Sequence, residues 1–153
     1  MRQRRLPSYS PPVGSPKQTA GQETMPLKLR SINATSAPEP VGGYSQALET
    51  TSSIRRLYIS GQIPMARGGA VPDSFAEQAK LVWANVLAQL EAADMTIGNL
   101  VKVTIFLSDR KYALENRQAR QEALGDHAPA LTVIIAGIFD EAWLLEIEAI
   151  AEA

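Results

Sequence analysis

Residues 101–107 read Val-Lys-Val-Thr-Ile-Phe-Leu and decide the fold class of this chain. The apolar members Val, Val, Ile and Leu occupy every second position, with Lys102, Thr104 and Phe106 between them. Because successive side chains of a strand point to opposite faces, this alternation predicts a β-strand with one well-buried face. Such a face must be covered by helices or by another sheet.

The segments on either side of this strand have helical patterns. Ser74–Ala93 begins with capping-box spacing between Ser74 and Glu77 and repeats apolar residues at helical intervals, with Trp83 expected in the core. After the strand, Asp109 can cap a helix that ends near Leu124. This second helix is unusually polar, so we expect one broad face of it in water.

Further strands are expected at both ends of this central unit. Their segments are Leu27–Ile32, Tyr44–Thr50, Arg55–Ser60, Leu131–Ile138 and Leu144–Ala151. The resulting order β-β-β-α-β-α-β-β predicts an α/β fold, a mixed sheet with two helices packed on one face. The weakly alternating segment Thr132–Ile135 would expose apolar surface in a monomer, which favours a symmetric homo-oligomer.

The first residues differ in composition from the rest. Residues 1–24 are rich in Pro, Ser, Gln and Gly and show no apolar periodicity, so we expect a disordered tail followed by one domain over residues 25–153. Arg2, Arg4 and Arg5 resemble the start of a secretory signal, but no apolar segment follows. Met25, where the globular pattern begins, is a candidate for the natural start.

Composition narrows the chemistry. The 153 residues contain no cysteine and a single histidine, His127, so thiolate catalysis and Cys- or His-rich metal sites are excluded. A formal net charge of −1 does not favour nucleic-acid binding. No apolar run approaches the ~20 residues that span a bilayer, and a cytoplasmic location is expected.

Several motifs resemble those of one family, the Rid (YjgF-type, reactive-intermediate deaminase) family. They are Pro40-Val41-Gly42-Gly43-Tyr44-Ser45-Gln46-Ala47, Tyr58-Ile59-Ser60-Gly61-Gln62-Ile63-Pro64, Asn85-Val86-Leu87 with Leu90-Glu91-Ala92-Ala93, Val101–Leu107, Pro129-Ala130 and Leu145–Ala151. They occur in the family's order and spacing and cover nearly all of residues 31–151.

The resemblance implies a chorismate-mutase-like fold assembled as a homotrimer, with ligand sites in the clefts between subunits. Its best-known members hydrolyse enamine or imine intermediates to a keto acid and ammonia, without cofactor or metal. By the resemblance, Glu146 would hold and polarise the attacking water. The residues expected to bind substrate are Tyr44, Ser60, Gly61, Pro129 and Leu131.

Each of these roles has a structural alternative. Tyr44 could be an interface aromatic, Ser60-Gly61 a turn that ends a strand, and Glu146 the outward residue of an alternating strand. The strand pattern does place Glu146 and Glu148 on one face, where a desolvated carboxylate would be a suitable general base.

One position departs from the family pattern. Deaminating members follow Pro-Ala with an arginine that binds the substrate carboxylate, whereas this chain has Leu131. Leucine offers neither charge nor donor, and a carboxylate desolvated against it would lack a partner. Arg117, Arg120 or Arg67 could substitute, although arginines on so polar a helix are usually solvated.

Three functional hypotheses follow. The favoured one is an altered enzyme, which hydrolyses an imine, enamine or related metabolite other than the usual 2-imino acids. The alternative is a non-catalytic module that binds a small molecule in the same cleft. Nucleic-acid work ranks last, because the globular part shows no basic stripe interleaved with aromatics.

Overall fold

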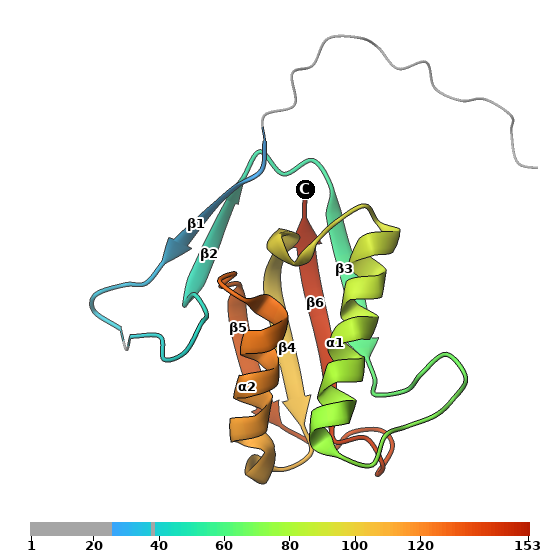
Figure 1. Ribbon diagram of the computed structural model, residues 1–153. Helices are drawn as coiled ribbons and strands as arrows, with labels where there is room; N and C mark the ends of the chain where they lie inside the picture. Colours follow the sequence, from blue (N-terminus) through green and yellow to red (C-terminus); the bar gives the residue numbers. More distant parts are fainter. Residues whose placement is uncertain (1–25, 38) are drawn as a thin grey trace, which may run out of the picture.

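Two helices cover one face of a sheet in the computed structural model, which describes residues 26–37 and 39–153 (Figure 1). Helices α1 and α2 span Phe75–Ala92 and Ala113–Leu124, and the short 3-10 helices η1 and η2 span Ile97–Asn99 and Arg110–Tyr112. The predicted capping-box spacing of α1 yields a Ser74 N-cap, since the Ser74 side chain accepts from the Glu77 backbone N–H and its hydroxyl donates to the Glu77 carboxylate at 2.6 Å.

The main sheet is mixed, as predicted. Strand β4 (Leu100–Leu107) pairs parallel with β5 (Ala130–Ile135) and antiparallel with β6 (Leu145–Glu152). Strand β3 (Arg56–Gln62) pairs antiparallel with the other edge of β6, which gives the order β3-β6-β4-β5. A parallel pair needs a crossover connection, and α2 provides it between β4 and β5.

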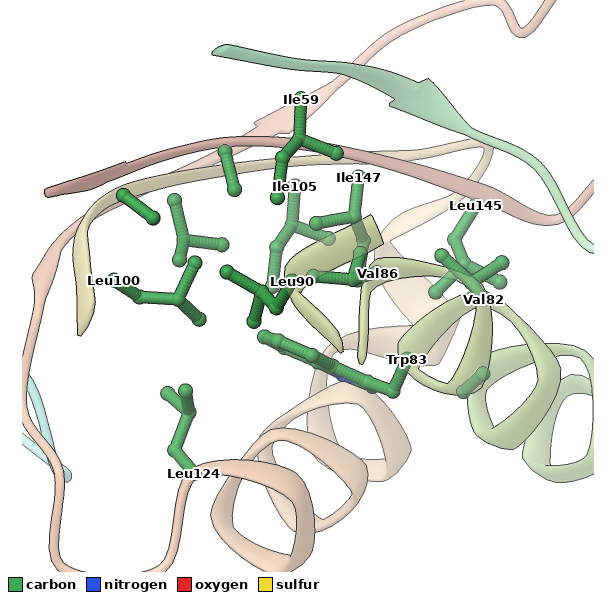
Figure 2. Packing of buried hydrophobic residues seen from close by; sticks show 14 of the residues in the cluster. Ile59, Val82, Trp83, Val86, Leu90, Leu100, Ile105, Leu124, Leu145 and Ile147 are labelled. Carbon is green, nitrogen blue, oxygen red and sulfur yellow. The ribbon is translucent and has the colours of Figure 1, made fainter. Parts of the chain in front are cut away.

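The core lies between this sheet and the two helices. Val103, Ile105 and Leu107 are fully buried on the helix side of β4, which confirms the face predicted from their alternation. Figure 2 shows Trp83 and Leu90 of α1 packed beneath the sheet residues of the same cluster, so Trp83 is a core residue as predicted. Burial of this cluster fixes which face of the sheet remains open.

Strands β1 (Lys28–Ile32) and β2 (Ala47–Thr51) depart from the expected single sheet. They form a separate antiparallel two-stranded sheet that projects from the domain (Figure 1). An isolated bridge between Ser45 and Ala130 joins the segment before β2 to the start of β5. The strand pattern was sufficient to predict the two strands, but their pairing with each other is a choice of partner that local periodicity does not encode.

Apolar side chains remain uncovered on both edge strands of the main sheet. Val133, Ile134 and Ile135 of β5 are each more than two-fifths exposed, with Ile134 on the face opposite to Val133 and Ile135, and Tyr58 of β3 is more exposed still. This confirms that Thr132–Ile135 leaves apolar surface uncovered in a single chain.

Some sequence-based expectations fall outside the described residues. The tail over residues 1–24 and the proposed start at Met25 belong to residues 1–25, which the structure does not describe. Within residues 26–37 and 39–153, no helix has the length and apolar character needed to cross a membrane.

Candidate functional site

A cavity of about 310 Å³ lies between α2, β5 and the loop before β2, and it contains two of the predicted site residues. We call it the α2 cavity. Its lining residues are Val41, Tyr44, Ala113, Asn116, Arg117, Arg120, Leu131 and Val133. The structure therefore brings Tyr44 and Leu131 together, as the resemblance implied.

The loop that carries Tyr44 is tied to the start of β5. Gly42 and Gly43 adopt positive φ angles of 87° and 61°, a backbone conformation that glycine tolerates without strain. Beyond them, the Ser45 backbone N–H donates to Pro129 O at 3.1 Å and the Ser45 hydroxyl donates to Ala128 O at 2.7 Å. Pro129 thus helps to position Tyr44.

Arg120 contradicts the expectation of a solvated arginine. Only 5% of the residue is exposed, and its Nη2 donates to Gly42 O at 2.7 Å, whereas its Nε has no hydrogen-bond partner among residues 26–37 and 39–153. Burial lowers the pKa of the Arg120 guanidinium, and repulsion from Arg117 lowers it further, although Tyr44 opposes the shift. Its helix neighbour Arg117 lines the same cavity and is exposed.

Sequence reasoning did not single out Asn116. The residue is 2% exposed, lines the α2 cavity, and its Oδ1 has no hydrogen-bond partner within the described residues. A weak signal existed, because Asn116, Arg120 and Leu124 recur at intervals of four and share one face of a helix. Because two members of this stripe are polar, apolar periodicity alone does not reveal it.

A second group forms around Glu146. A Cβ atom built on Gly61 would lie 1.7 Å from Glu146 Oε1, so the carboxylate occupies the space beside the bare glycine backbone. No larger residue at position 61 leaves the carboxylate where it is. The structure therefore brings Gly61 and Glu146 together, and the contact requires glycine.

Ser60 lies beside Gly61 at an irregularity in β3. Ile59 pairs with Ala149 and Gln62 with Ile147, so β3 has one residue more than β6 between these pairs, as in a β-bulge. Ser60 lines a cavity of about 280 Å³ on the open face of the sheet, together with Lys102 and Glu148. We call it the open-face cavity.

The two groups of predicted residues do not meet within one chain. Ser60, Gly61 and Glu146 are absent from the lining of the α2 cavity, and Tyr44 and Leu131 are absent from the lining of the open-face cavity. A single subunit thus presents the predicted site residues as two separate groups.

The other residues considered from the sequence lie outside both groups of site residues. His127 Nε2 lies 2.7 Å from Leu100 O, a contact that holds the loop before β5 against the start of β4. Arg67 lies exposed in a turn and does not line the α2 cavity. A further cavity of about 540 Å³ between α1 and α2 contains none of the predicted site residues.

The available side chains limit the chemistry that these two groups offer. Glu146 supplies a carboxylate that can accept a proton from water. The α2 cavity supplies guanidinium donors, the Tyr44 hydroxyl and the Asn116 amide. Within the described part of the chain, no three His, Cys, Asp or Glu side chains are grouped as metal ligands would be.

Comparison with known sequences identifies relatives over most of the chain. Residues 34–153 match the family described as Endoribonuclease L-PSP. A RutC family protein of Pyrococcus horikoshii is 34% identical over 117 residues, which cover 75% of this chain and 90% of the relative. A 2-iminobutanoate/2-iminopropanoate deaminase of Bos taurus is 34% identical over 127 residues, or 82% of this chain and 90% of the relative.

Comparison with solved structures supports the same fold. A Rid-family protein of unknown function from Yersinia pestis superposes with a TM-score of 0.72 and covers 82% of this chain and 98% of its own, at 24% identity. At that identity the likeness establishes the fold alone. The chorismate-mutase-like α/β fold implied by the motifs is confirmed.

Proposed function

Because the chain belongs to the Rid (Endoribonuclease L-PSP) family, we propose that it forms a homotrimer whose inter-subunit cleft hydrolyses an imine, enamine or related metabolite other than the usual 2-imino acids. The contact between Glu146 and Gly61 carries this proposal. It joins the one predicted catalytic carboxylate to a position where an added side chain would displace that carboxylate. The deaminase relative from Bos taurus supports the class of reaction.

In the proposed reaction, Glu146 accepts a proton from a water molecule that attacks the imine carbon. The C=N bond becomes a carbinolamine, and loss of ammonia from it leaves a carbonyl group, so that one water is consumed for each ammonia released. Ser60 and the backbone of Gly61 would contact the ligand beside the carboxylate. None of these steps requires a cofactor.

The separation of the two half-sites supports placement of the cleft between subunits. In a closed ring, one copy would supply Tyr44 and Leu131 and its neighbour would supply Ser60, Gly61 and Glu146. The uncovered apolar residues of β5 support the same assembly, because exposed apolar surface of this kind is typical of an interface. The cytoplasmic location and the absence of nucleic-acid binding remain predictions.

Leu131 limits the substrate in this proposal. Its side chain lines the α2 cavity and packs against the core, so a carboxylate at this position would be desolvated beside an alkyl group. Burying an unpaired carboxylate costs several kcal/mol. The favoured substrate therefore does not place its α-carboxylate against Leu131.

The alternative is a binding module without turnover. The apolar lining of Val41, Leu131 and Val133 favours this alternative, since ligand pockets are mostly apolar with few polar groups. Under it, a Glu146→Ala variant would retain ligand binding and no variant would show hydrolysis.

The hydrolysis of a freshly generated 2-imino acid tests the proposal. We expect slow or undetectable hydrolysis by the full chain and a gain of about tenfold or more for Leu131→Arg, since two charge-assisted hydrogen bonds to the carboxylate become available. Leu131→Met is the matched control and should gain nothing. Adding Glu146→Gln to the arginine variant should abolish the gain.

Rapid hydrolysis by the unaltered chain would show that Leu131 does not limit the substrate. If Leu131→Arg remains inactive although it binds the imino acid, the altered-enzyme proposal is wrong and the binding module is favoured.

A further inference from the structure

The α2 cavity has an unbalanced charge. Two of its eight lining residues are arginines and none is acidic. The ion pairs of the described chain are Arg30 with Glu49 and Arg56 with Glu152, so neither Arg117 nor Arg120 has a carboxylate partner. The cavity therefore holds two positive charges without a counter-charge from the described residues.

The helix sequence accounts for this imbalance. Helical neighbours lie three and four residues apart, and these positions around Arg117 hold Ala113, Leu114, Arg120 and Gln121. The acidic residues of α2, Glu115 and Glu122, line the cavity between α1 and α2 instead. Helix α2 thus separates its charges, with the cations facing Tyr44 and Leu131.

Arg120 is held in place, but its hydrogen-bonding capacity is only partly used. Its hydrogen bond to Gly42 O fixes the guanidinium beside the Tyr44 loop, while its buried Nε and the buried Asn116 Oδ1 lack partners in the part of the chain that the structure describes. A buried charge without a partner is unfavourable unless something in the functional state pairs with it. Guanidinium groups stay charged, and their planar donors match the oxygens of carboxylate and phosphate groups.

From this arrangement we propose that Arg117 and Arg120 form an anion subsite that binds a doubly charged oxyanion group, a phosphate or a dicarboxylate. Two adjacent guanidiniums with no acidic neighbour favour a ligand that carries two negative charges over a single monocarboxylate. The Asn116 Oδ1 is then available to accept a hydrogen bond from an N–H or O–H group of the same ligand. The subsite specifies only the anionic group of the ligand, and the identity of the rest of the ligand rests on the proposed function.

The subsite gives the proposed substrate a class. A short 2-imino acid has one carboxylate, next to the reacting carbon, and that group would meet Leu131. A substrate with a phosphate or a second carboxylate places charge at α2 instead. The expected substrate is therefore an imine or enamine that carries a doubly charged group.

Binding of simple anions to the full chain tests the subsite without any turnover. We would titrate inorganic phosphate, succinate and acetate by isothermal titration calorimetry at fixed ionic strength. Phosphate, succinate or both should bind at least about tenfold more tightly than acetate, and Arg117→Gln should weaken that binding by about tenfold or more. Arg67→Gln, which alters an exposed arginine outside the cavity, is the matched control and should leave it unchanged.

Two further variants keep the test interpretable. Arg120→Gln could disturb the Tyr44 loop, so Arg120→Lys, which keeps the charge but loses the fork of donors, is measured beside it. Tight phosphate with weak succinate identifies a phosphate ligand, and the reverse identifies a dicarboxylate. Either result supports the subsite.

Equal affinities for the three anions, no binding of any of them, or binding that Arg117→Gln leaves intact would overturn it. Because the readout is binding, it is independent of imine hydrolysis. Arginine-dependent binding in a chain that hydrolyses no imine would retain the subsite and reject the proposed function. Imine hydrolysis without arginine-dependent anion binding would retain the proposed function and reject the subsite.

Discussion

The contact between Gly61 and Glu146 shows how one missing side chain can position a functional group. The carboxylate occupies the volume that a Cβ atom at position 61 would need. In Gly61→Ala we expect the carboxylate to move rather than the backbone, because the overlap is with the flexible end of the glutamate. Any hydrolytic activity should fall by about 10²-fold or more, the usual contribution of a positioned general base.

Thermal unfolding and hydrolysis should be measured together for this variant. The expected result is a large loss of activity with a small change in melting temperature. Gly68→Ala is the matched control, because no atom lies within 4 Å of the added Cβ there. An active Gly61→Ala chain would show that Glu146 needs no fixed position.

Residue types alone predicted part of the candidate site. The family resemblance proposed Tyr44, Leu131, Gly61 and Glu146 for one cleft, and the structure brings Tyr44 to Leu131 and Gly61 to Glu146 as two groups. The burial of Arg120 did not follow, because a charged side chain on a polar helix is normally solvated. Only the tertiary contact with Gly42 O shows which arginine is held inside.

Among the elements, the pair β3–β6 carries the clearest pH dependence. Arg56 and Glu152 are direct cross-strand partners, with Arg56 Nη2 2.6 Å from Glu152 Oε1, and Glu152 is only 3% exposed. Burial by itself would raise the pKa of the Glu152 carboxyl, but the Thr50 hydroxyl and the Arg56 guanidinium outweigh it and hold this pKa below its ordinary value.

A carboxyl group whose pKa is lower in the folded chain stabilises the fold above its unfolded pKa, about 4.3 for glutamate. That stabilisation is lost as the pH falls through the lower folded pKa. The free energy of unfolding should therefore decrease on acidification below about pH 5, and less steeply in Glu152→Gln. Urea unfolding at several pH values measures both slopes.

Glu49→Gln provides the control for this measurement. Glu49 also pairs with an arginine, Arg30, but both side chains are exposed. Exposed ion pairs contribute little to stability, so this variant should keep the slope of the unaltered chain. Equal slopes for all three proteins would show that Glu152 is not the titrating group.

At the scale of the whole molecule, the element order and the covered face of the sheet were predictable, whereas the association of strands was not. Alternation within β4 and the Ser74 N-cap of α1 depend on neighbours in the sequence. The separate β1–β2 sheet depends on contacts between distant segments, which periodicity does not specify. The same limit applies to the site, since its two halves come from different regions of the chain.

The proposed assembly therefore makes a prediction that no single chain can fulfil. Tyr44→Ala should damage one half-site and Glu146→Gln the other, each introduced in the Leu131→Arg background so that 2-imino acid hydrolysis can be read. Alone, each variant should be nearly inactive. If each cleft takes one half-site from each of two neighbouring subunits, equal mixtures refolded together should recover about a quarter of the parent activity. Each of the two half-sites is intact in half of the subunits, so about one cleft in four has both intact.

Refolding each variant by itself is the control, and mixing the two without unfolding should recover less, because the subunits then exchange slowly or not at all. Size-exclusion chromatography with light scattering should give the mass of a trimer before and after refolding. A refolded mixture that has the mass of a trimer but stays inactive, although the Leu131→Arg parent is active, would contradict a cleft shared between subunits. Both groups of site residues would then have to act within one subunit.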